Sequence, residues 1–485
     1  MFVFLSKIST QVINYNLDLI HNIQYENSSS NFGVSDVWGY TDEFENEYAI
    51  VGYKNGTSIL NVSGDNPIEI ANILGPSTGD YYYHRDYKTY GDYLYIVNEM
   101  YGGDVGMQVI DLSPLPQNEP MQLETYNYIG QSHNLWIDNN GFAFIEHQMG
   151  DNIQIVNLEN PSQPLYESTF GNLASNCHDI YSINNIAYVS EGWNNQFGIY
   201  DIQDLNNISQ IATIPVEGYA HNAWINNTEN IMVTTEETAG KTIKIWDISN
   251  LNNINLLSEY LGENHLAHNA HIKGNLVYIS HYTTGIKIID IFNPVRPVEV
   301  AAYDTYPIND EGGFYGCWGT YPFASNEYIY ASDMQNGLFI LNFENINAGW
   351  TYGNIYFNNS IPLQNATIKS LLNNKIFYTD DEGYFDIGFP EGEHLFIVNN
   401  QDTISIQFSA HQEQMENIYI GQELIIGDIN QDLNIDILDI IMIINIILNN
   451  FNPNEEQMWT SDINNDNLIN IQDIILLVQI ILGES

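Results

Sequence analysis

Apolar and polar residues alternate over short stretches along most of the chain, and the pattern repeats. Between residues 31 and 345 the repeat length is about 46 residues. Each repeat closes with an apolar run that ends in a polar turn: SILNVSG (58–64), MQVIDLS (107–113), IQIVNLEN (153–160), FGIYDIQ (197–203), IKIWDIS (243–249), IKIIDIFNP (286–294) and LFILNFEN (338–345). A second run, such as YLYIVNEM or LVYISHYT, precedes each of them. Such runs between Gly, Asn and Pro turns are typical of short antiparallel strands.

Four strands in about 45 residues make one blade of a β-propeller. The repeats therefore predict a seven-bladed β-propeller over residues 16–348. A parallel solenoid is the alternative, although its repeats are usually shorter. The segment NLDLIHNIQY (16–25) looks like a strand without a repeat of its own, and we expect it to complete the last blade. Residues 1–15 are expected to be the remnant of a signal region, because MFVFLSKIS is too short for a signal peptide and lacks a clear cleavage site.

A second register in the repeats carries aromatic and imidazole side chains. Its members are Trp38, His84, His133, His178, His221, His268 and Trp318. Because equivalent positions of a propeller lie on a ring, we expect them to face one end of the central channel. One interpretation is a transition-metal or ligand site on the axis, formed by the imidazoles. The other is structural, with each histidine donating to a carbonyl of the neighbouring blade. His271 and His281 lie near this register and are candidates to join such a site.

Oxygen-bearing side chains recur at a fixed spacing in GDINQDLNIDILD and SDINNDNLINIQD, near the end of the chain. Counted from the first Asp of each stretch, they occupy positions 1, 3, 5, 9 and 12, and position 7 adds a backbone carbonyl. This is the ligand spacing of an EF-hand-type loop, which predicts two Ca²⁺ ions. The predicted ligands are Asp428, Asn430, Asp432, Asn434, Asp436 and Asp439, and Asp462, Asn464, Asp466, Leu468, Asn470 and Asp473. The alternative is a pair of acidic helix-capping loops without an ion.

Position 6 of such a loop favours glycine, because the backbone turns there through positive φ. Leu433 holds this position in the first loop and Asn467 in the second. Asn tolerates the left-handed region and Leu does so poorly. We therefore expect weaker calcium binding in the first loop.

Residues 424–485 resemble a dockerin module, a small all-α pair of EF-hand-like loops in which position 12 is often Asp. The resemblance implies attachment to a cohesin domain. It also implies contact positions at Ile437, Leu438, Ile444, Asn445, Ile471, Gln472, Val478 and Gln479. Many relatives carry Ser, Thr, Lys or Arg there. The apolar character here indicates either an apolar partner or docking onto the preceding domain of the same chain.

Two further resemblances cover the rest of the chain. The repeats resemble the choice-of-anchor B family, with its LVIVD-type repeats, in SDVWGYTDEFENEYAIVGYKNGTSILNVS, GMQVIDLS and DTYPINDEGGFYGCWGTYPF. This implies a secreted propeller with a variable C-terminal attachment module and supplies no catalytic residues. Within residues 350–421, TDDEGYFDIGFPEGEH resembles a carboxypeptidase-regulatory-like, transthyretin-like β-sandwich, which implies a spacer or adhesion module. The expected fold is thus mostly β, with a small helical module at the end.

Charge narrows the classes of partner. The chain has 61 acidic and 11 basic residues, a formal charge of −50, and no Lys or Arg after Lys375. Phosphate binding needs clustered cations, so nucleic acid is excluded and an anionic membrane surface is disfavoured. No apolar run has the length of a membrane span. The two cysteines define no disulfide framework. Such acidity suits an extracellular or cell-surface protein in salty, calcium-containing water.

Common catalytic motifs are missing, among them GxSxG, the Walker loop, GxGxxG and HExxH. We therefore expect a secreted, calcium-binding, non-catalytic display protein. In this hypothesis the propeller recognises an unidentified ligand, the sandwich spaces it, and the dockerin attaches it to a cohesin-bearing scaffold or cell surface. The alternative is a polysaccharide-active hydrolase or lyase with a metal on the histidine ring, in which His84, His133, His178, His221 and His268 are the candidate ligands.

Overall fold

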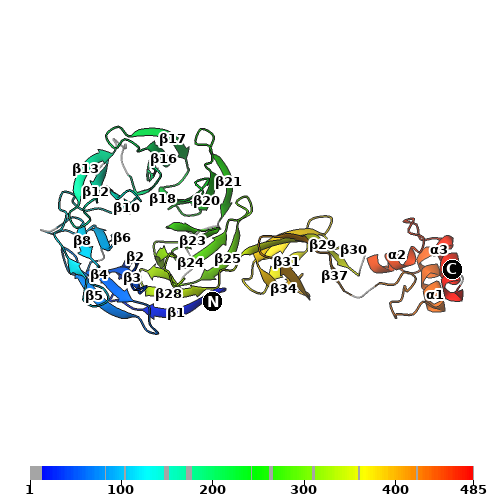
Figure 1. Cartoon of the computed structure of the whole chain (residues 1–485). Coiled ribbons are helices and arrows are strands. Elements are labelled where there is room, and N and C mark those ends of the chain that lie inside the picture. The colour runs from blue at the N-terminus through cyan, green and yellow to red at the C-terminus, as the bar shows by residue number, and fades with distance from the viewer. Residues whose placement is uncertain are drawn as a thin grey trace, which may run out of the picture. The chain divides into compact units, whose positions relative to one another are not determined.

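The computed structural model describes residues 14–483 except 82–83, 103–104, 147–151, 171–176, 242, 261–265, 309–311, 359–360 and 422–423. The chain divides into two compact units, residues 1–348 with 388–391 and residues 349–387 with 392–485. Strands dominate the described residues, and the helices lie near the C-terminal end (Figure 1). None of the helices in these ranges has the length and apolarity needed to cross a membrane.

The first unit contains seven four-stranded antiparallel sheets among its described residues, and six of them use consecutive strands. The strands of these six are β2 (Val34–Thr41), β3 (Glu47–Tyr53), β4 (Gly56–Asn61) and β5 (Ile68–Leu74); β6 (Arg85–Tyr90), β7 (Tyr93–Asn98), β8 (Gln108–Asp111) and β9 (Met121–Gln122); β10 (Leu135–Ile137), β11 (Phe142–Glu146), β12 (Ile153–Asn157) and β13 (Leu165–Phe170); β14 (Asp179–Ile183), β15 (Ile186–Ser190), β16 (Gln196–Asp201) and β17 (Ser209–Pro215); β18 (Ala220–Ile225), β19 (Ile231–Glu236), β20 (Ile243–Asp247) and β21 (Asn255–Tyr260); and β22 (Ala270–Lys273), β23 (Leu276–Ser280), β24 (Ile286–Asp290) and β25 (Val298–Tyr303).

The last sheet of this unit joins the two ends of the repeat region. It contains β26 (Cys317–Tyr321), β27 (Ile329–Asp333) and β28 (Gly337–Phe343), and its outer strand is β1 (Leu17–Ile23). β1 pairs antiparallel with β28, with Leu17 opposite Phe343. The expectation that the N-terminal strand completes this sheet is therefore confirmed.

The first strands of the sheets lie next to one another in chain order, from β2 beside β6 to β22 beside β26, and β26 lies beside β2. The sheets consequently follow one another around a common centre, as in a β-propeller (Figure 1). The hydrophobic core lies between neighbouring sheets. Tyr48 and Ile59 of the sheet that starts with β2, for example, pack with Tyr87 and Ile96 of the next, and all four are fully buried.

The second unit begins with two small sheets, the pattern of a β-sandwich. One contains β29 (Ala348–Phe357), β30 (Ile361–Pro362), β33 (Tyr384–Pro390), β36 (Glu413–Met415) and β37 (Ile418–Ile420), and the other contains β31 (Thr367–Ser370), β32 (Ile376–Tyr378), β34 (Gly392–Val398) and β35 (Asp402–Phe408). The TDDEGYF turn joins β32 to β33, where Asp380 accepts the backbone N–H of Tyr384 at 2.8 Å. Alternate residues of β35 are buried, which gives its sheet one apolar face.

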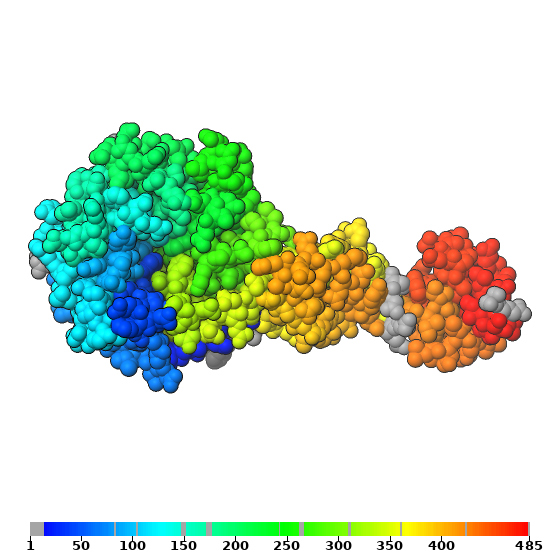
Figure 2. All heavy atoms as spheres, in the orientation of Figure 1, coloured from blue at the N-terminus to red at the C-terminus, as the bar shows by residue number. Residues whose placement is uncertain are grey.

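Three helices end the unit: α1 (Ile437–Ile447), α2 (Glu455–Ser461) and α3 (Ile471–Leu482). α1 and α3 are the helices predicted after the two acidic loops, and their contact buries Ile443 and Leu477. Figure 2 shows this C-terminal segment in orange and red. α2 was not predicted from the sequence. It starts at Asn454, whose side chain accepts the backbone N–H of Gln457, while the Gln457 side chain accepts that of Asn454.

Candidate functional site

Five histidines form most of a closed circle at the axis of the first unit. Each lies at or just before the first strand of its sheet, from β6 to β22. Neighbouring imidazole centroids are separated by 4.2 Å (His84–His133), 4.7 Å (His133–His178), 4.1 Å (His178–His221) and 4.4 Å (His221–His268). The Trp318 ring closes the circle at 4.2 Å from His268 and 5.3 Å from His84. We call these six residues the axial ring.

Trp38 does not belong to the axial ring, and its expected place there was wrong. Its indole packs against Tyr321 at 5.0 Å and beneath the Lys88 ammonium at 4.4 Å. Gly319 directly follows Trp318, and a Cβ atom added to it would lie 2.2 Å from the Asp36 carboxylate. Asp36 is therefore the residue of β2 that lies beside Gly319. Trp38 is two residues further along the strand, so it faces the same channel one layer deeper.

The two additional histidines also lie outside the ring. His271 packs on Trp224 at 4.6 Å, in the same deeper layer as Trp38. His281 Nδ1 lies 2.7 Å from the Thr284 hydroxyl. Neither therefore joins the circle of imidazoles.

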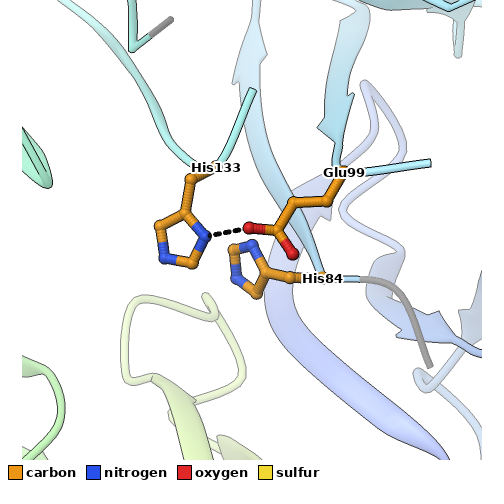
Figure 3. Close-up of side chains that lie close together, drawn as sticks. All are labelled: His84, Glu99 and His133. Atoms are coloured by element: carbon orange, nitrogen blue, oxygen red, sulfur yellow. Dashed lines mark hydrogen bonds and ion pairs between the residues drawn. The ribbon is translucent and has the colours of Figure 1, made fainter. Parts of the chain in front are cut away.

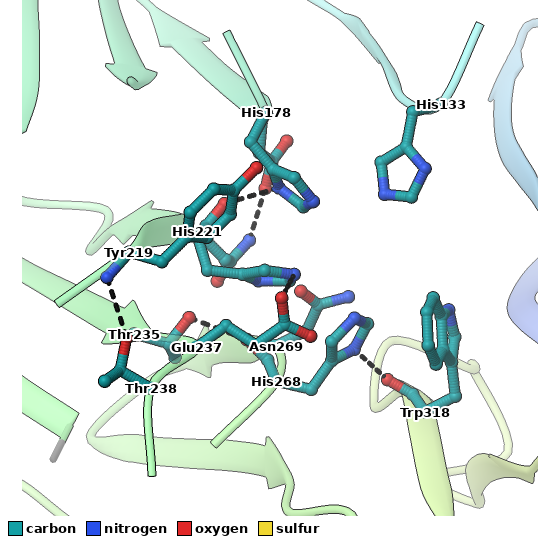
Figure 4. A network of polar contacts seen from close by, with 12 residues as sticks. His133, His178, Tyr219, His221, Thr235, Glu237, Thr238, His268, Asn269 and Trp318 are labelled. Carbon is teal, nitrogen blue, oxygen red and sulfur yellow. Dashed lines mark hydrogen bonds and ion pairs between the residues drawn. The ribbon is translucent and has the colours of Figure 1, made fainter. Parts of the chain in front are cut away.

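Carboxylates that the sequence did not single out face the axial ring. Glu99 follows β7, Glu146 ends β11 and Glu237 follows β19. His133 Nδ1 lies 2.8 Å from a Glu99 oxygen, with His84 stacked alongside (Figure 3). Glu237 Oε2 lies 3.8 Å from His221 Nε2 (Figure 4). The other oxygen of Glu237 accepts the Tyr282 hydroxyl. The sequence did contain a signal for these carboxylates. Several repeats have an acid at or just after their second strand, as in YIVNE, FAFIE and VTTEE.

The histidines of the ring are held in two different protonation states. Burial alone would lower the pKa of His133, but the hydrogen bond to Glu99 and the charge of Glu146 raise it to about 9. Burial and the positive charge of His133 lower the pKa of His84 and His178 well below their ordinary value. Burial likewise lowers the pKa of His221, and that of His268 to about 3. One imidazolium thus lies among neutral imidazoles.

Two of the histidines use one ring nitrogen to join neighbouring sheets. His178 Nδ1 donates to the carbonyl of His221 at 3.1 Å, and His268 Nδ1 donates to that of Trp318 at 2.5 Å. This is the structural interpretation of the register, and it holds for these two. Because Nδ1 carries the proton in both, each Nε2 keeps its lone pair.

Thermal stability of the full chain is expected to fall as the pH rises from 7.5 to 9. Burial raises the pKa of Glu146 to about 8, so the folded protein keeps protons on Glu146 and His133 that the unfolded chain has released. The neutral histidines are almost fully unprotonated in both states above about pH 7.5, so they do not oppose this fall there. For each extra proton that the folded protein binds, the free energy of unfolding falls by about 1.4 kcal/mol per pH unit. Calorimetry should record this as a fall of several degrees in the unfolding temperature.

Glu99→Gln is expected to flatten this pH profile, because it removes the partner that keeps His133 charged. His21→Gln, on the outer strand β1, serves as the control with an unchanged slope. Equal slopes in the wild type and Glu99→Gln would contradict the assignment.

A deeper layer of the channel holds a buried ion pair and a network of amides and acids. Lys88 Nζ lies 2.9 Å from Asp86 Oδ1, and both side chains are almost fully buried. Asn222 donates to Asp179 at 2.7 Å and accepts the backbone N–H of Ala270 at 3.1 Å. Burial raises the pKa of Asp179 to about 7.

The two acidic loops repeat one hydrogen-bonding pattern. In the first, the Asp428 carboxylate accepts the backbone N–H groups of Asp432 at 3.1 Å and Leu433 at 2.8 Å. In the second, Asp462 accepts those of Asp466 at 3.1 Å and Asn467 at 2.7 Å. Identical partners at identical loop positions show that both loops adopt the same turn.

The acids at position 12 close the loops. Asp439 accepts the backbone N–H groups of Ile429 at 2.8 Å and Asp436 at 2.9 Å, and Asp473 does the same with Ile463 and Asn470, both at 2.9 Å. Asp436 and Asn470 are also the N-caps of α1 and α3. Helix capping, the alternative interpretation, is therefore present in both loops.

The donor chemistry of the loops nevertheless fits a calcium ion. Asp439 and Asp473 are fully buried, and no Lys or Arg follows Lys375 to compensate them. A carboxylate has about four acceptor sites, so the backbone bonds leave capacity for a cation. Side chains at positions 1, 3, 5, 9 and 12 supply only oxygen, the ligand that Ca²⁺ prefers.

The side chains proposed for partner contact lie mostly on open surface. Ile437 and Ile471 are 66% and 68% exposed, and Leu438, Ile444, Gln472 and Gln479 are also exposed. Asn445 and Val478 are half-buried. The first turns of α1 and α3 thus present apolar side chains to solvent.

Comparison with known proteins identifies the C-terminal part. Residues 426–482 match the family described as Dockerin type I domain. No curated protein sequence matches the chain. Solved structures similar to it include a catalytically inactive virginiamycin B lyase from Staphylococcus aureus with quinupristin (14% identity, TM-score 0.49), its selenomethionine-substituted form (15%, 0.48) and the computationally designed Ika8 protein (10%, 0.45). Each similarity covers 67% of this chain and 99% of the other chain.

Proposed function

We propose that this chain is an extracellular, non-catalytic display protein attached to a cohesin-bearing scaffold or cell surface. The proposal starts from the dockerin type I domain at the C-terminal end of the chain. The propeller, with seven blades over residues 16–348, presents the axial ring to a ligand. Residues 350–421 act as a spacer and residues 424–485 as the attachment module. The observation that carries the proposal is the pair of acidic loops with the same hydrogen-bonding pattern, each leading into an apolar helix within the matched residues.

Two Ca²⁺ ions are proposed to hold the attachment module together. One would be bound by Asp428, Asn430, Asp432, Asn434, Asp436 and Asp439, and the other by Asp462, Asn464, Asp466, Leu468, Asn470 and Asp473. The first loop has four carboxylates and the second has three, so a divalent cation at each offsets repulsion that no basic side chain of this segment relieves.

The proposed docking surface is formed by the exposed apolar side chains of α1 and α3. It comprises Ile437, Leu438, Ile444, Asn445, Ile471, Gln472, Val478 and Gln479. A partner surface rich in apolar groups suits these residues, because burying such side chains releases about 25 cal/mol per Å². A cohesin is the proposed partner. Docking onto the chain's own β-sandwich is the competing outcome.

Capture of the full chain on a panel of immobilised type I cohesins, in millimolar calcium and after chelation, tests the proposal. At least one cohesin is expected to retain the chain only with calcium. A paired substitution, Ile437→Glu with Ile471→Glu, is expected to abolish capture, whereas Leu395→Glu, on the exposed side of β34, should not. No retention by any cohesin would overturn the assignment.

Leu433→Gly is expected to strengthen calcium binding by the first loop. Leu433 has φ +69° and Asn467 has φ +66°, as position 6 requires. A leucine in this region costs about 1–2 kcal/mol, so relief of 1 kcal/mol corresponds to roughly fivefold tighter binding in a calorimetric calcium titration. Asn467→Gly is the matched control with a smaller gain. Unchanged affinity in Leu433→Gly would show that the strain is not relieved.

A polysaccharide-active hydrolase or lyase is the second candidate function. The observation that favours it is the axial ring itself, where neutral imidazoles and carboxylates face one another in a channel. Hydrolysis or elimination of polysaccharides by the full chain, lost in His221→Ala, would establish this activity.

A further inference from the structure

We propose that His221, Glu237 and His268 bind a divalent transition-metal ion at the axial ring. This site is independent of the attachment function. Only the histidines were expected from the sequence, and Glu237 completes the set. One ligand atom from each of the three residues lies within 4.8 Å of the others. Atoms that share an ion at about 2.1 Å lie within about 4.2 Å of one another, so small side-chain rotations suffice.

Ring nitrogens at this place lack partners. Nε2 of His221 and Nε2 of His268 are both buried without a hydrogen bond to any described residue. The nearest carboxylate oxygen to His221 Nε2, from Glu237, lies at 3.8 Å, beyond hydrogen-bonding range. Buried polar atoms are nearly always satisfied, so unpaired imidazole nitrogens facing a carboxylate indicate a bound cation.

The surroundings orient these side chains as they do in metal sites. His268 Nδ1 donates to the Trp318 carbonyl, which directs the Nε2 lone pair inward (Figure 4). The Tyr282 hydroxyl donates to the other oxygen of Glu237. Ligating imidazoles and carboxylates usually have such outer hydrogen bonds, which fix the tautomer and the orientation.

The chemistry of the three ligands also favours a transition metal. A ligating histidine must be neutral, and the bond from His268 Nδ1 to the Trp318 carbonyl leaves Nε2 of His268 without a proton. Two imidazoles and one carboxylate are the ligand types of zinc and non-haem iron sites that keep positions open for a ligand.

A second group of two histidines and a glutamate, on the other side of the ring, provides the contrast. His84, Glu99 and His133 also lie close enough to share an ion. There a Glu99 oxygen accepts from His133 at 2.8 Å, and the pKa of His133 is raised to about 9. His133 therefore holds a proton where a metal ligand needs a lone pair, and this group is an ion pair.

The test is metal binding by the full chain, stripped with a chelator and kept in millimolar calcium so that the acidic loops are saturated. Titration with Co²⁺ and Zn²⁺, followed by calorimetry and by the visible absorption of Co²⁺, is expected to give one ion per chain. Glu237→Gln and His268→Gln should weaken binding by about a hundredfold or more. Glu99→Gln and His133→Gln should leave it nearly unchanged.

Circular dichroism of each metal-free variant shows whether binding is lost because a ligand is missing or because the protein is unfolded. The conservative variant Glu237→Asp keeps a carboxylate and should retain part of the metal affinity. No binding by the wild type would overturn the proposal, as would binding that survives in both folded Glu237→Gln and folded His268→Gln. Binding lost only in His133→Gln would move the site to the other group. Cohesin capture should be the same in all these variants, so the attachment function is tested separately.

Discussion

Replacing Asp428 and Asp462 together with alanine is expected to abolish calcium-dependent capture by a cohesin. Each carboxylate stands at position 1 of its loop and also accepts two backbone N–H groups. A lost hydrogen bond to a charged group costs about 1.5–3 kcal/mol, and the proposed ion adds its own binding energy to folding. We therefore expect at least a hundredfold loss of capture, with less helix formed by α1 and α3, measured by surface binding and circular dichroism.

Glu455→Gln is the control for this double variant, because it removes an exposed acid at the start of α2, outside both loops. It should bind the same cohesin with wild-type affinity. Capture of the double variant, or capture of the wild type in chelator, would show that the loops are helix caps without an ion.

Lys88→Met is expected to destabilise the propeller by about 3–5 kcal/mol, the usual cost of removing one partner of a buried ion pair. The ammonium lies 2.9 Å from Asp86 and above the Trp38 ring, and the pKa of the nearby Asp36 is raised well above its ordinary value by burial and by Asp86. Without Lys88, the buried Asp86 loses the cation that compensates its charge. Equilibrium unfolding of the full chain in denaturant, followed by tryptophan fluorescence, measures the loss.

The destabilisation should be smaller at pH 5.5 than at pH 7.5, because the channel acids take up protons as the pH falls. Asp179, whose pKa is raised to about 7 by burial, would be neutral at the lower pH. Lys241→Met provides the matched control, since it removes the cation of a solvent-exposed pair with Glu217 and should change little. An effect of Lys88→Met no larger than that of Lys241→Met would show that the pair contributes only packing.

Periodicity made most of the fold of the first unit predictable. The seven apolar runs, from SILNVSG to LFILNFEN, lie on the third strands of the sheets, and residues 16–25 supply the added strand. These features depend on local alternation and spacing, which a sequence displays directly. α2 escaped prediction because its seven residues, EEQMWTS, have no apolar face long enough to stand out.

The axial ring was only partly predictable. Equal spacing identified the five histidines, but it misplaced Trp38. The histidines lie at or close to the starts of their strands, whereas β2 begins at Val34, four residues before Trp38, so Trp38 lies in a deeper layer of the channel. Glu99, Glu146 and Glu237 could not be singled out among 61 acids by composition. Their approach to the ring depends on where the second strands end in space, which no spacing within one repeat reveals.

The two interpretations of the histidine register describe different atoms of the same residues. Nδ1 of His178 and His268 makes the contact between sheets, while the unpaired nitrogens of His221 and His268 face inward. Sequence reasoning treated them as alternatives because it assigns one role to a residue. An imidazole has two nitrogens with separate partners.

The pairing of β1 with β28 has a consequence for biosynthesis. Leu17 leaves the ribosome more than three hundred residues before its partner Phe343. Until then the circle stays open and β1 has no neighbour, while β28, once made, offers an apolar edge that other nascent chains can join. Ring closure thus joins the most widely separated strands of the propeller and carries a loop-closure cost in entropy, and a chaperone that shields this edge would raise the yield of assembled protein.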